Sequence, residues 1–485
     1  METVIVGDFN RIVIPVLSNI RTAGGRLRGL RCVHTTLTGA SVSEEDIMDM
    51  ACLRLDLISV LTIKDCLPEK LYTAHLLPAV KEEQSWATLA PVHPAAQTMS
   101  CLQLIEAVES EFVRLDLKGG VDKGRDRALL VSVTARGRGV AEESLLELAE
   151  LTRSAGVHVL ETIIQRRKKI HPRFILGRGK LMEIMLLSLR LDANLLIFDQ
   201  ELSPSQVRSV TDHTDMRVID RTQLILDIFA GRARSREGKL QIEMAQLKYM
   251  LPRLSARDDA LSRLTGGIGA RGPGETKLEI DRRRINDRIA RLSRELKAVG
   301  RQRYHRRSRR RKKDVPVISL VGYTNAGKST LLNTLTESDI QAEDLLFATL
   351  DPTSRRLRFP RDREVIITDT VGFIRHLPAE LLKAFASTLE ELQEADLLLH
   401  VIDVASSSWR EKMLVVEELL RDLGLDRIPR LNVYNKMDRV QEAGGHFPGD
   451  SDGVFVSAID VRTLSPLLEK AERMLARSLM GTLKG

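Results

Sequence analysis

One stretch of the sequence constrains the fold more than any other: "VPVISLVGYTNAGKSTLLNTL", which begins at Val315. A β-branched run ending at Val321 leads into Gly322-x-x-x-x-Gly327-Lys328-Ser329, and apolar residues at helical spacing follow. This order of strand, glycine-rich turn and helix is the context that a phosphate-binding loop requires, because backbone N–H groups then surround the phosphate oxygens. The sequence therefore predicts a strand–loop–helix unit that binds a nucleoside polyphosphate.

Two side chains of this loop have expected chemical roles. The ammonium of Lys328 should contact the β- and γ-phosphates and assist catalysis, and the hydroxyl of Ser329 should ligate Mg²⁺. The other loop residues are expected to line the nucleotide: Gly322, Tyr323, Thr324, Asn325, Ala326, Gly327 and Thr330.

Polar residues also follow the apolar runs downstream. "EVIITDTVG" ends in Asp369, which is expected to hold Mg²⁺ through water, with Thr370 and Val371 beside the nucleotide. Gly372 can offer its N–H to the γ-phosphate, so we expect it to act in catalysis.

Further apolar runs, "LLLHVID", "IPRLNVYNKMD" and "GVFVSAI", complete the series. Strands that alternate with helices and carry ligands at their carboxyl ends predict a doubly wound, mostly parallel sheet. A carboxylate at Asp438 accepts hydrogen bonds from N1–H and the exocyclic amine of guanine, whereas adenine offers neither donor there. The predicted ligands are GTP and GDP, and these residues should surround the base: Asn435, Lys436, Met437, Asp438, Ser457, Ala458 and Ile459.

Residues 315–485 resemble a translation-factor-type GTPase domain with all five of its motifs. Between the phosphate-binding loop and Asp369, "LFATLDPTSRRL" is similar to the first switch of the HflX family of ribosome-associated GTPases. The resemblance implies that Thr349 completes the Mg²⁺ shell and acts in catalysis. It also implies that its neighbours lie along the nucleotide: Phe347, Ala348, Leu350 and Asp351.

The residue after Gly372 departs from the commonest GTPase pattern. Many relatives place a glutamine there to orient the attacking water. Here Phe373 and then Ile374 follow, and neither side chain can form a hydrogen bond with water. We therefore expect slow intrinsic hydrolysis that accelerates when a partner orders the switches. The HflX family shares this apolar substitution.

A second glycine-rich stretch, "GGIGARGPGETKLEIDRRR", begins at Gly266. Its Gly-x-Gly-x-x-Gly spacing matches a dinucleotide-binding loop, but no strand precedes it, so that interpretation fails. Apolar residues repeat every three or four positions on both sides, which predicts an antiparallel helical hairpin with residues 255–275 at its tip. The tip is either an ordinary surface turn or a place where side-chain-free backbone and arginines approach RNA.

Charge and resemblance both bear on that choice. Residues 315–485 contain 20 Lys and Arg against 26 Asp and Glu, whereas residues 1–314 contain 54 against 40. Arg301–Lys313 alone contains nine basic residues, a pattern typical of solvated or nucleic-acid-contacting segments. The glycine stretch resembles the most distinctive stretch of the HflX family. This implies contact with 23S rRNA of the large (50S) ribosomal subunit near the peptidyl-transferase centre, through Gly266, Gly267, Gly269, Arg271, Gly272 and Gly274.

Residues 125–230 alternate strand-like and helical patterns and predict a small α/β domain. Within it "GRGK" is most simply a tight turn before a helix, but the family resemblance makes Arg178 and Lys180 candidate rRNA contacts. Residues 1–110 show strands and a helix, with Gln84–Thr98 expected as a linker. Met1 lies directly before a strand, which indicates a start within a longer domain.

The chain is thus expected to be an α/β protein in four parts. These are an N-terminal extension (1–110), an HflX-type α/β domain (125–230), a helical hairpin with a basic linker (231–313) and a P-loop GTPase domain (314–485). It lacks a long apolar run and a recognisable signal peptide, and its four cysteines form no C-x-x-C pair. We therefore expect buried free thiols, no membrane span, a cytoplasmic location and a monomer away from the ribosome.

The resemblance implies a GTPase that dissociates or recycles stalled or idle ribosomes. A GTPase of large-subunit assembly would share almost every residue named above. Two further alternatives are a regulatory G protein without an RNA role, and an ATP-driven RNA-remodelling enzyme that acts through the N-terminal α/β domain.

Overall fold

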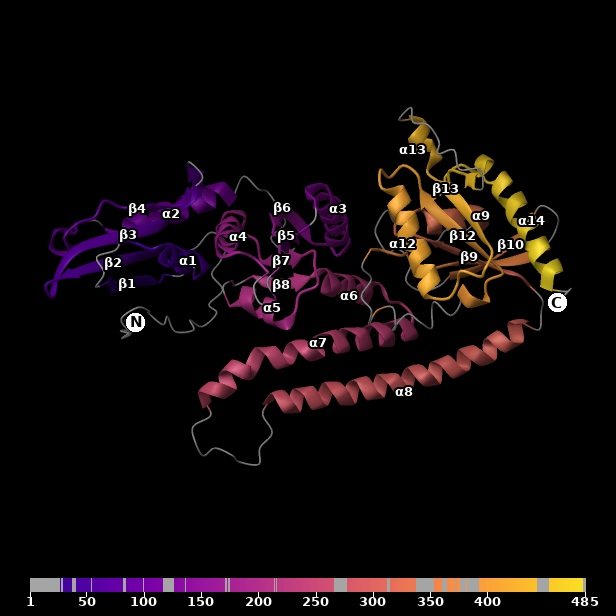
Figure 1. Ribbon diagram of the computed structural model, residues 1–485, viewed down its shortest axis with the longest axis horizontal. Coiled ribbons are helices and arrows are strands. Elements are labelled where there is room, and N and C mark those ends of the chain that lie inside the picture. The colour runs from indigo at the N-terminus through magenta and orange to yellow at the C-terminus, as the bar shows by residue number, and fades with distance from the viewer. Residues whose placement is uncertain are drawn as a thin grey trace. The chain divides into compact units, whose positions relative to one another are not determined.

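The computed structural model describes residues 27, 29–36, 41–53, 55–81, 84–98, 100–116, 126–135, 137–170, 172, 175–212, 214, 216–265, 277–311, 315–336, 353–359, 364–370, 372–375, 381, 392–442 and 453–482. The chain divides into two compact units, Met1–Arg221 and Thr222–Gly485. Figure 1 labels the helices and strands along the chain.

The first unit opens with a mixed four-stranded sheet of order β1-β2-β3-β4. Its elements are β1 (Arg31–Thr36), α1 (Glu44–Cys52), β2 (Leu57–Lys64), β3 (Leu67–Lys81), β4 (Gln84–Thr88), η1 (Pro94–Ala96) and α2 (Cys101–Asp116). Helix α1 begins at a capping box between Ser43 and Asp46, which satisfies two backbone donors at its first turn. Buried residues of the sheet, such as Ile58 and Leu76, pack against both helices.

The prediction of a linker at Gln84–Thr98 was wrong for the first five of these residues. These residues form β4, which pairs antiparallel with β3, so that Trp86 lies opposite Leu76 and packs against the core of this sheet. The two prolines of the segment, Pro91 and Pro94, lie beyond the strand, where they cannot interrupt its hydrogen bonds.

The second sheet of this unit is wholly parallel, with order β6-β5-β7-β8. Its elements are β5 (Arg127–Thr134), α3 (Arg138–Ser154), β6 (His158–Arg166), α4 (Arg178–Leu191), β7 (Leu195–Phe198), α5 (Pro204–Thr211) and β8 (Arg217–Asp220). All four residues of β7 are buried, as expected for a parallel strand covered on both faces. Ser203 caps α5 through a capping box with Gln206.

A buried ionic cluster lies at the carboxyl ends of these strands. The guanidinium of Arg221, whose side chain is 3% exposed, pairs with Glu147 of α3 and with Asp199 after β7. Ser132 and Ser144 donate hydrogen bonds to Asp199. Burial alone would lower the pKa of Arg221, but the two carboxylates raise it above its ordinary value. The cluster therefore joins β5, α3 and β7 to the residue at which the first unit ends.

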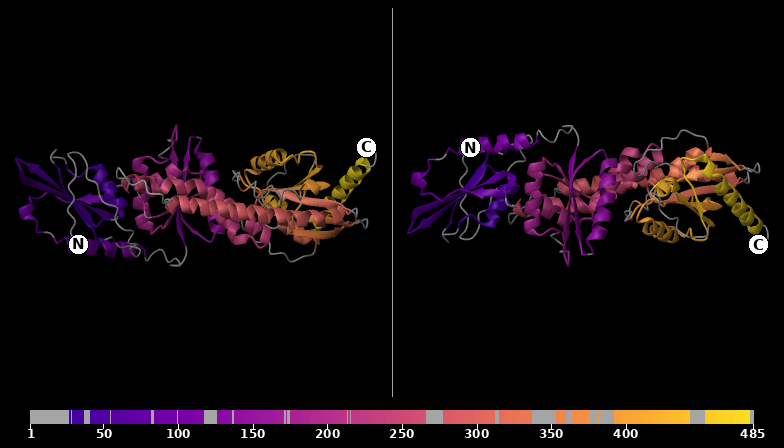
Figure 2. Two further views of the ribbon diagram at one scale, coloured as in Figure 1. Left: turned by 90° about the horizontal axis from the view of Figure 1, so that it is seen from below. Right: turned by 90° about the horizontal axis from the view of Figure 1, so that it is seen from above.

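The boundary between the units falls after the first residue of α6 (Arg221–Arg232). The rest of this helix, α7 (Arg236–Thr265) and α8 (Lys277–Arg311) belong to the second unit. Helices α7 and α8 run side by side as an antiparallel pair (Figures 1 and 2). Arg288 donates two hydrogen bonds to the carboxylate of Glu243, at 2.7 and 2.9 Å, and Leu292 is fully buried. The predicted helical hairpin is confirmed.

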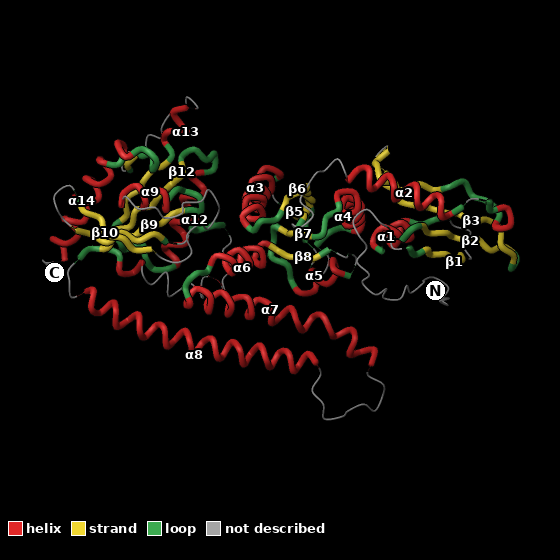
Figure 3. The backbone as a smooth tube through the Cα atoms, turned by 180° about the vertical axis from the view of Figure 1, so that it is seen from behind, coloured by secondary structure: helices red, strands yellow, loops and turns green. Residues whose placement is uncertain are grey.

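The ends of the hairpin differ from the prediction. Helix α7 continues through Pro252 to Thr265, so the helical backbone includes the first half of the tip predicted at 255–275. Helix α8, drawn as one long helix in Figure 3, includes the basic block as far as Arg311 according to its bounds. Arginine, alanine and leucine favour helix, and these residues supply most of both extensions.

The second unit also contains a six-stranded sheet of order β10-β11-β9-β12-β13-β14. The strands are β9 (Val317–Gly322), β10 (Thr353–Arg358), β11 (Glu364–Asp369), β12 (Leu397–Asp403), β13 (Arg430–Asn435) and β14 (Val454–Phe455). All neighbours are parallel except β10, which pairs antiparallel with β11.

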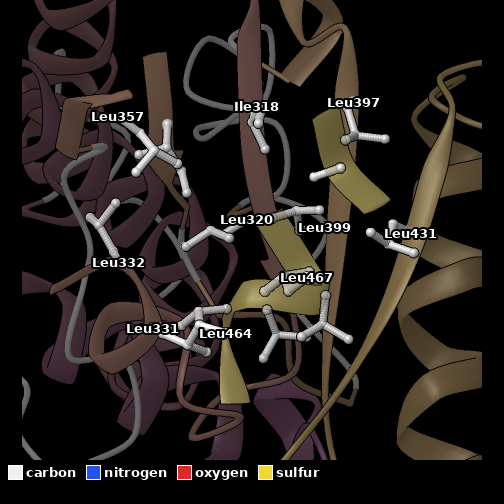
Figure 4. Close-up of a cluster of buried hydrophobic side chains, with 14 of the residues drawn as sticks. Ile318, Leu320, Leu331, Leu332, Leu357, Leu397, Leu399, Leu431, Leu464 and Leu467 are labelled. Carbon is white, nitrogen blue, oxygen red and sulfur yellow. The ribbon is translucent and has the colours of Figure 1, made fainter. Parts of the chain in front are cut away.

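Helices cover both faces of this sheet. Their bounds, with those of short 3-10 turns, are α9 (Lys328–Thr336), η3 (Leu392–Glu394), α12 (Trp409–Asp422), α13 (Met437–Glu442), η4 (Val461–Thr463) and α14 (Ser465–Thr482). On one face the larger core packs side chains such as Leu320 and Leu399 against α9 and α14 (Figure 4). On the other, the rings of Trp409 and Tyr434 form a T-shaped pair at a centroid distance of 5.9 Å, and Tyr434 stacks on Phe455 at 4.8 Å. The doubly wound, mostly parallel sheet is confirmed.

Two further findings concern the whole described chain. None of its helices is both long and apolar enough to span a membrane. Cys66 is exposed, and Cys32 and Cys101 are half-buried free thiols, so the expectation of buried thiols was wrong for Cys66.

Candidate functional site

The predicted phosphate-binding loop joins β9 to α9 at the carboxyl edge of the six-stranded sheet. Two glycines are required by space and by backbone conformation. At Gly322, with φ of +155°, a Cβ atom would lie 2.3 Å from the carbonyl oxygen of Val401. At Gly327, with φ of +91°, it would lie 2.3 Å from Nδ2 of Asn435. The loop therefore leaves the sheet only because these positions have no side chain.

Lys328 is 6% exposed and its ammonium points back across the loop. Nζ donates to the carbonyl oxygens of Gly322 at 3.1 Å and Tyr323 at 2.9 Å. Burial lowers the pKa of Lys328 to about 8, and the nearby Asp369 carboxylate opposes that shift. A phosphate beside the ammonium would favour its charged form further, so this cation is suited to a polyanionic ligand.

Ser329 and Asp369 bring two oxygen ligands together. The hydroxyl of Ser329 donates to Oδ2 of Asp369 at 2.6 Å, and Oδ1 accepts from the backbone N–H of Thr370 at 2.9 Å. Among the described residues no group of three or more His, Cys, Asp or Glu side chains could hold a metal by itself. One hydroxyl and one carboxylate fit Mg²⁺, which keeps several waters and takes its remaining ligands from substrate phosphates.

The residues predicted to recognise the base lie at the ends of β13 and β14. Asn435 fastens them to the phosphate-binding loop: Nδ2 donates to the carbonyl of Ala326 at 2.8 Å, and Oδ1 accepts from the N–H of Ala458 at 2.9 Å. Nζ of Lys436 donates to the carbonyl of Asn325 at 2.8 Å. The two predicted halves of the site are thus joined by hydrogen bonds between loops that are far apart in sequence.

The carboxylate of Asp438 is held at the rim of this edge. Its Oδ1 accepts from the hydroxyl of Ser457 at 2.7 Å. Ile459 is 74% exposed, and Met437 begins α13. The sequence interpretation missed Asp403, which ends β12 and pairs with Lys436 at 2.8 Å. Its place at the carboxyl end of a strand was the available signal.

The segment after Asp369 lies against the loop. Thr370 donates through its hydroxyl to the carbonyl of Leu320 at 2.6 Å. Phe373 and Ile374 are each 2% exposed, so the apolar residues at this position are buried. Thr330 lies in the first turn of α9.

Several predicted site residues fall outside the described part of the chain and stay predictions. They are Phe347, Ala348, Thr349, Leu350, Asp351 and Val371 of the nucleotide site, and Gly266, Gly267, Gly269, Arg271, Gly272 and Gly274 of the hairpin tip. Of the two candidate RNA contacts in the first unit, Arg178 begins α4, and Lys180 donates to both carboxylate oxygens of Glu183 at 2.7 and 2.8 Å.

A buried histidine beneath the site makes stability depend on pH. His400 of β12 is 1% exposed, and no described group forms a hydrogen bond with its Nδ1. Burial, followed by the positive charges of Arg430 and Lys328, lowers the pKa of His400 to about 3. The folded protein thus holds this imidazole neutral, whereas the unfolded chain takes up a proton near pH 6.5.

Acidification should therefore destabilise the fold through His400, because the unfolded state binds more protons between those two pKa values. Between pH 7 and pH 4.5 the unfolding free energy of the wild type should fall. In His400→Gln that fall should be smaller by about 2–3 kcal/mol. Urea unfolding of both proteins at the two pH values, followed by near-ultraviolet circular dichroism, measures this. Equal losses of unfolding free energy in wild type and variant would show that His400 is protonated at pH 4.5 in the folded state as well.

Three family models match consecutive parts of the chain. Residues 142–230 match a model described as GTP-binding GTPase N-terminal, and residues 232–310 match GTP-binding GTPase Middle Region. Residues 317–436 match 50S ribosome-binding GTPase. Together they include most of the second sheet, the hairpin and the phosphate-binding loop.

Curated relatives are similar over most of this length. The protein named GTPase HflX of Caldanaerobacter subterraneus subsp. tengcongensis is 50% identical over 353 residues, which are 73% of this chain and 81% of that protein. GTPase HflX of Escherichia coli (strain K12) is 49% identical over 300 residues, 62% of this chain and 70% of that protein. A solved GTP-binding protein from Sulfolobus solfataricus in complex with GDP is 26% identical and covers 73% of this chain and 99% of its own. Its TM-score of 0.39 is too low to support an argument. On the sequence relationships alone, the chain belongs to the HflX family of GTPases.

Proposed function

We propose that this GTPase binds the large ribosomal subunit and uses GTP binding and hydrolysis to dissociate or recycle stalled or idle ribosomes. One observation carries the nucleotide part of the proposal. The glycine-bounded loop with Lys328, the Ser329–Asp369 pair and the Asn435–Asp438 segment meet at one edge of the sheet, joined by direct hydrogen bonds. The match of residues 317–436 to a 50S ribosome-binding GTPase model supports the partner.

In the proposed mechanism the chain positions the reactants and stabilises charge. Lys328 neutralises the developing charge on the phosphates, and Gly372 donates its N–H to the transferring group. Mg²⁺, held by Ser329, by Asp369 through water and by Thr349, would supply electrostatic stabilisation of the phosphate oxygens. Phe373 and Ile374 are buried and cannot orient a water molecule, so hydrolysis should be slow until a partner orders the site.

The remaining parts of the chain take their proposed roles from the same partner. Residues 231–313 would carry the glycine-rich tip to 23S rRNA near the peptidyl-transferase centre, and residues 125–230 would add contacts through Arg178 and Lys180. The Lys180–Glu183 pair is on the surface and worth little, so a phosphate can replace Glu183 at small cost. Residues 1–110 would form an extension. We further propose a cytoplasmic location and a monomeric state away from the ribosome.

GTP hydrolysis with and without purified large subunits tests the proposal. We expect subunits to raise the rate by roughly 10²-fold or more, since partner-completed GTPase sites gain up to about 10⁵-fold. Replacing residues 266–276 with a Gly/Ser segment of equal length should abolish that stimulation and leave the intrinsic rate intact. Arg473→Ala removes an exposed cation of α14 and is the control for loss of a single arginine outside the tip.

The outcomes separate the alternatives. Equal rates with and without subunits would contradict the partner-activated mechanism. Stimulation that does not fall as salt rises would favour a regulatory G protein over an RNA-binding one, since phosphate contacts are salt-dependent. Stimulation by immature but not mature large subunits would favour an assembly role. ATP turnover that persists in a Lys328→Ala variant would point to the ATP-driven alternative.

A further inference from the structure

Tyr323, the second residue of the phosphate-binding loop, contacts the segment that follows Gly372. Its ring is 6% exposed, and its hydroxyl accepts a hydrogen bond from the backbone N–H of Arg375 at 2.8 Å. The ammonium of Lys412, on α12, lies 5.6 Å from the centre of the ring. A loop residue predicted only to line the nucleotide thus reaches away from it and into a neighbouring segment.

Backbone bonds reinforce this contact. Tyr323 and Phe373 form an isolated parallel bridge, in which the N–H of Thr324 donates to Phe373 at 2.7 Å and the N–H of Phe373 donates to Gly322 at 3.1 Å. The side chain of Arg375 pairs with Glu411 of α12. Residues 372–375 therefore form three hydrogen bonds with the phosphate-binding loop: two through the backbone of Phe373 and one from the N–H of Arg375 to the Tyr323 hydroxyl.

This arrangement leaves little space beside Lys328. A Cβ atom on Gly372 would lie 2.8 Å from Cγ2 and 2.9 Å from Cα of Thr324, and 3.1 Å from Nζ of Lys328. A γ-phosphate that accepts from both Lys328 Nζ and the Gly372 N–H must fit between these groups. Gly372 packs directly against Thr324 and close to Lys328, so a γ-phosphate bound between Lys328 and the Gly372 N–H would move residue 372 away from the loop.

We propose that Tyr323 is a latch that holds residues 372–375 against the phosphate-binding loop when no γ-phosphate is present, and so sets the preference between GDP and GTP. The inference rests on the proposed guanine-nucleotide site and adds a positioning residue to it. GDP has nothing to place between Lys328 and Gly372, so the latch can stay closed around it. Binding of GTP must break the hydrogen bond between the Tyr323 hydroxyl and the N–H of Arg375, and the free energy of that bond weakens the binding of GTP.

Tyr323→Phe keeps the ring and removes only the hydroxyl. Dissociation constants for GDP and for the non-hydrolysable analogue guanosine 5′-[β,γ-imido]triphosphate are measured by calorimetry with Mg²⁺. We expect the ratio of GDP to analogue dissociation constants to rise about fivefold, which corresponds to a net hydrogen bond of about 1 kcal/mol. Hydrogen exchange of peptides spanning residues 372–375 should also become faster in the variant without nucleotide, a change that a role in stability alone would not confine to this segment.

Arg375→Ala is the matched control. It keeps the backbone N–H that donates to the Tyr323 hydroxyl and removes the side chain that pairs with Glu411. Since the Glu411 side of this pair is 63% exposed, the ratio should move less than twofold. A ratio unchanged in Tyr323→Phe, with both nucleotides bound, would overturn the latch and leave the nucleotide site standing. A falling ratio would show that the hydroxyl serves the GTP state and would also overturn it. Failure of the wild type to bind either nucleotide would overturn the proposed function itself.

Discussion

Replacing Asp438 with asparagine is expected to reverse the base preference, so that xanthosine triphosphate is bound and hydrolysed better than GTP. A carboxylate accepts from N1–H and the exocyclic amine of guanine, whereas an amide presents a donor that matches the O2 carbonyl of xanthine. Each wrong pairing leaves a desolvated polar group without a partner, so we expect the preference to shift by at least about a hundredfold. The substitution keeps an oxygen at the position that accepts from Ser457, so the loop should retain its hydrogen bond.

Hydrolysis of the two nucleotides under single-turnover conditions measures this preference. Asp403→Asn is the matched control, because Asp403 pairs with Lys436 at the same edge of the sheet without an expected contact to the base. Asp403→Asn should weaken the binding of both nucleotides to a similar extent. If Asp438→Asn still prefers GTP by more than tenfold, Asp438 does not face the Watson–Crick edge of the base.

The second large effect is expected at the buried ionic cluster of the first unit. Arg221→Ala removes the cation and leaves Glu147 and Asp199 facing each other in a largely buried space. Breaking a buried pair in this way costs about 3–5 kcal/mol, because the remaining charges lose their partner but stay out of water. Hydrogen exchange of peptides from β5 and β7 should accelerate accordingly, while GTP affinity in the second unit stays near that of the wild type.

A combined variant separates lost charge pairing from lost packing. Arg221→Met together with Glu147→Leu and Asp199→Asn removes all three charges, and it should recover most of the stability that Arg221→Ala loses. An Arg221→Ala protein with unchanged exchange in β5 and β7 would show that the cluster is open to solvent.

Local patterns predicted five strands of the six-stranded sheet. These five are apolar runs, and each ligand segment follows such a run directly, so strand and motif support one another. The edge strand β10 was not predicted as a strand, because its sequence, TSRRLR, is mostly polar and its arginines are exposed. The helical hairpin was also predictable, since two apolar stripes at helical spacing need each other for burial. The end of α7 was not, because Ser255–Asp259 (SARDD) resembles a loop by composition, whereas the helix continues to Thr265.

Contacts between distant segments were beyond prediction. Nothing in the sequence near Tyr323 indicates that its hydroxyl would meet the N–H of Arg375, and the Asp403–Lys436 pair depends on the register of β12 against β13. Gln84–Thr88 forms a strand because β3 offers it an unpaired edge, which composition cannot reveal.

The aromatic contact between Trp409 and Tyr434 has an optical consequence. The chain has two tryptophans, and the other, Trp86, belongs to the other compact unit. Each unit therefore carries its own tryptophan, and in Trp86→Phe the tryptophan emission, excited above the absorption of tyrosine, comes from the GTPase sheet alone. Tyr434 directly precedes Asn435, so light emitted by Trp409 should change as a nucleotide occupies the base end of the site. Trp409→Phe gives the complementary signal from the first sheet, and the unfolding of the two units can be followed separately in the full-length chain.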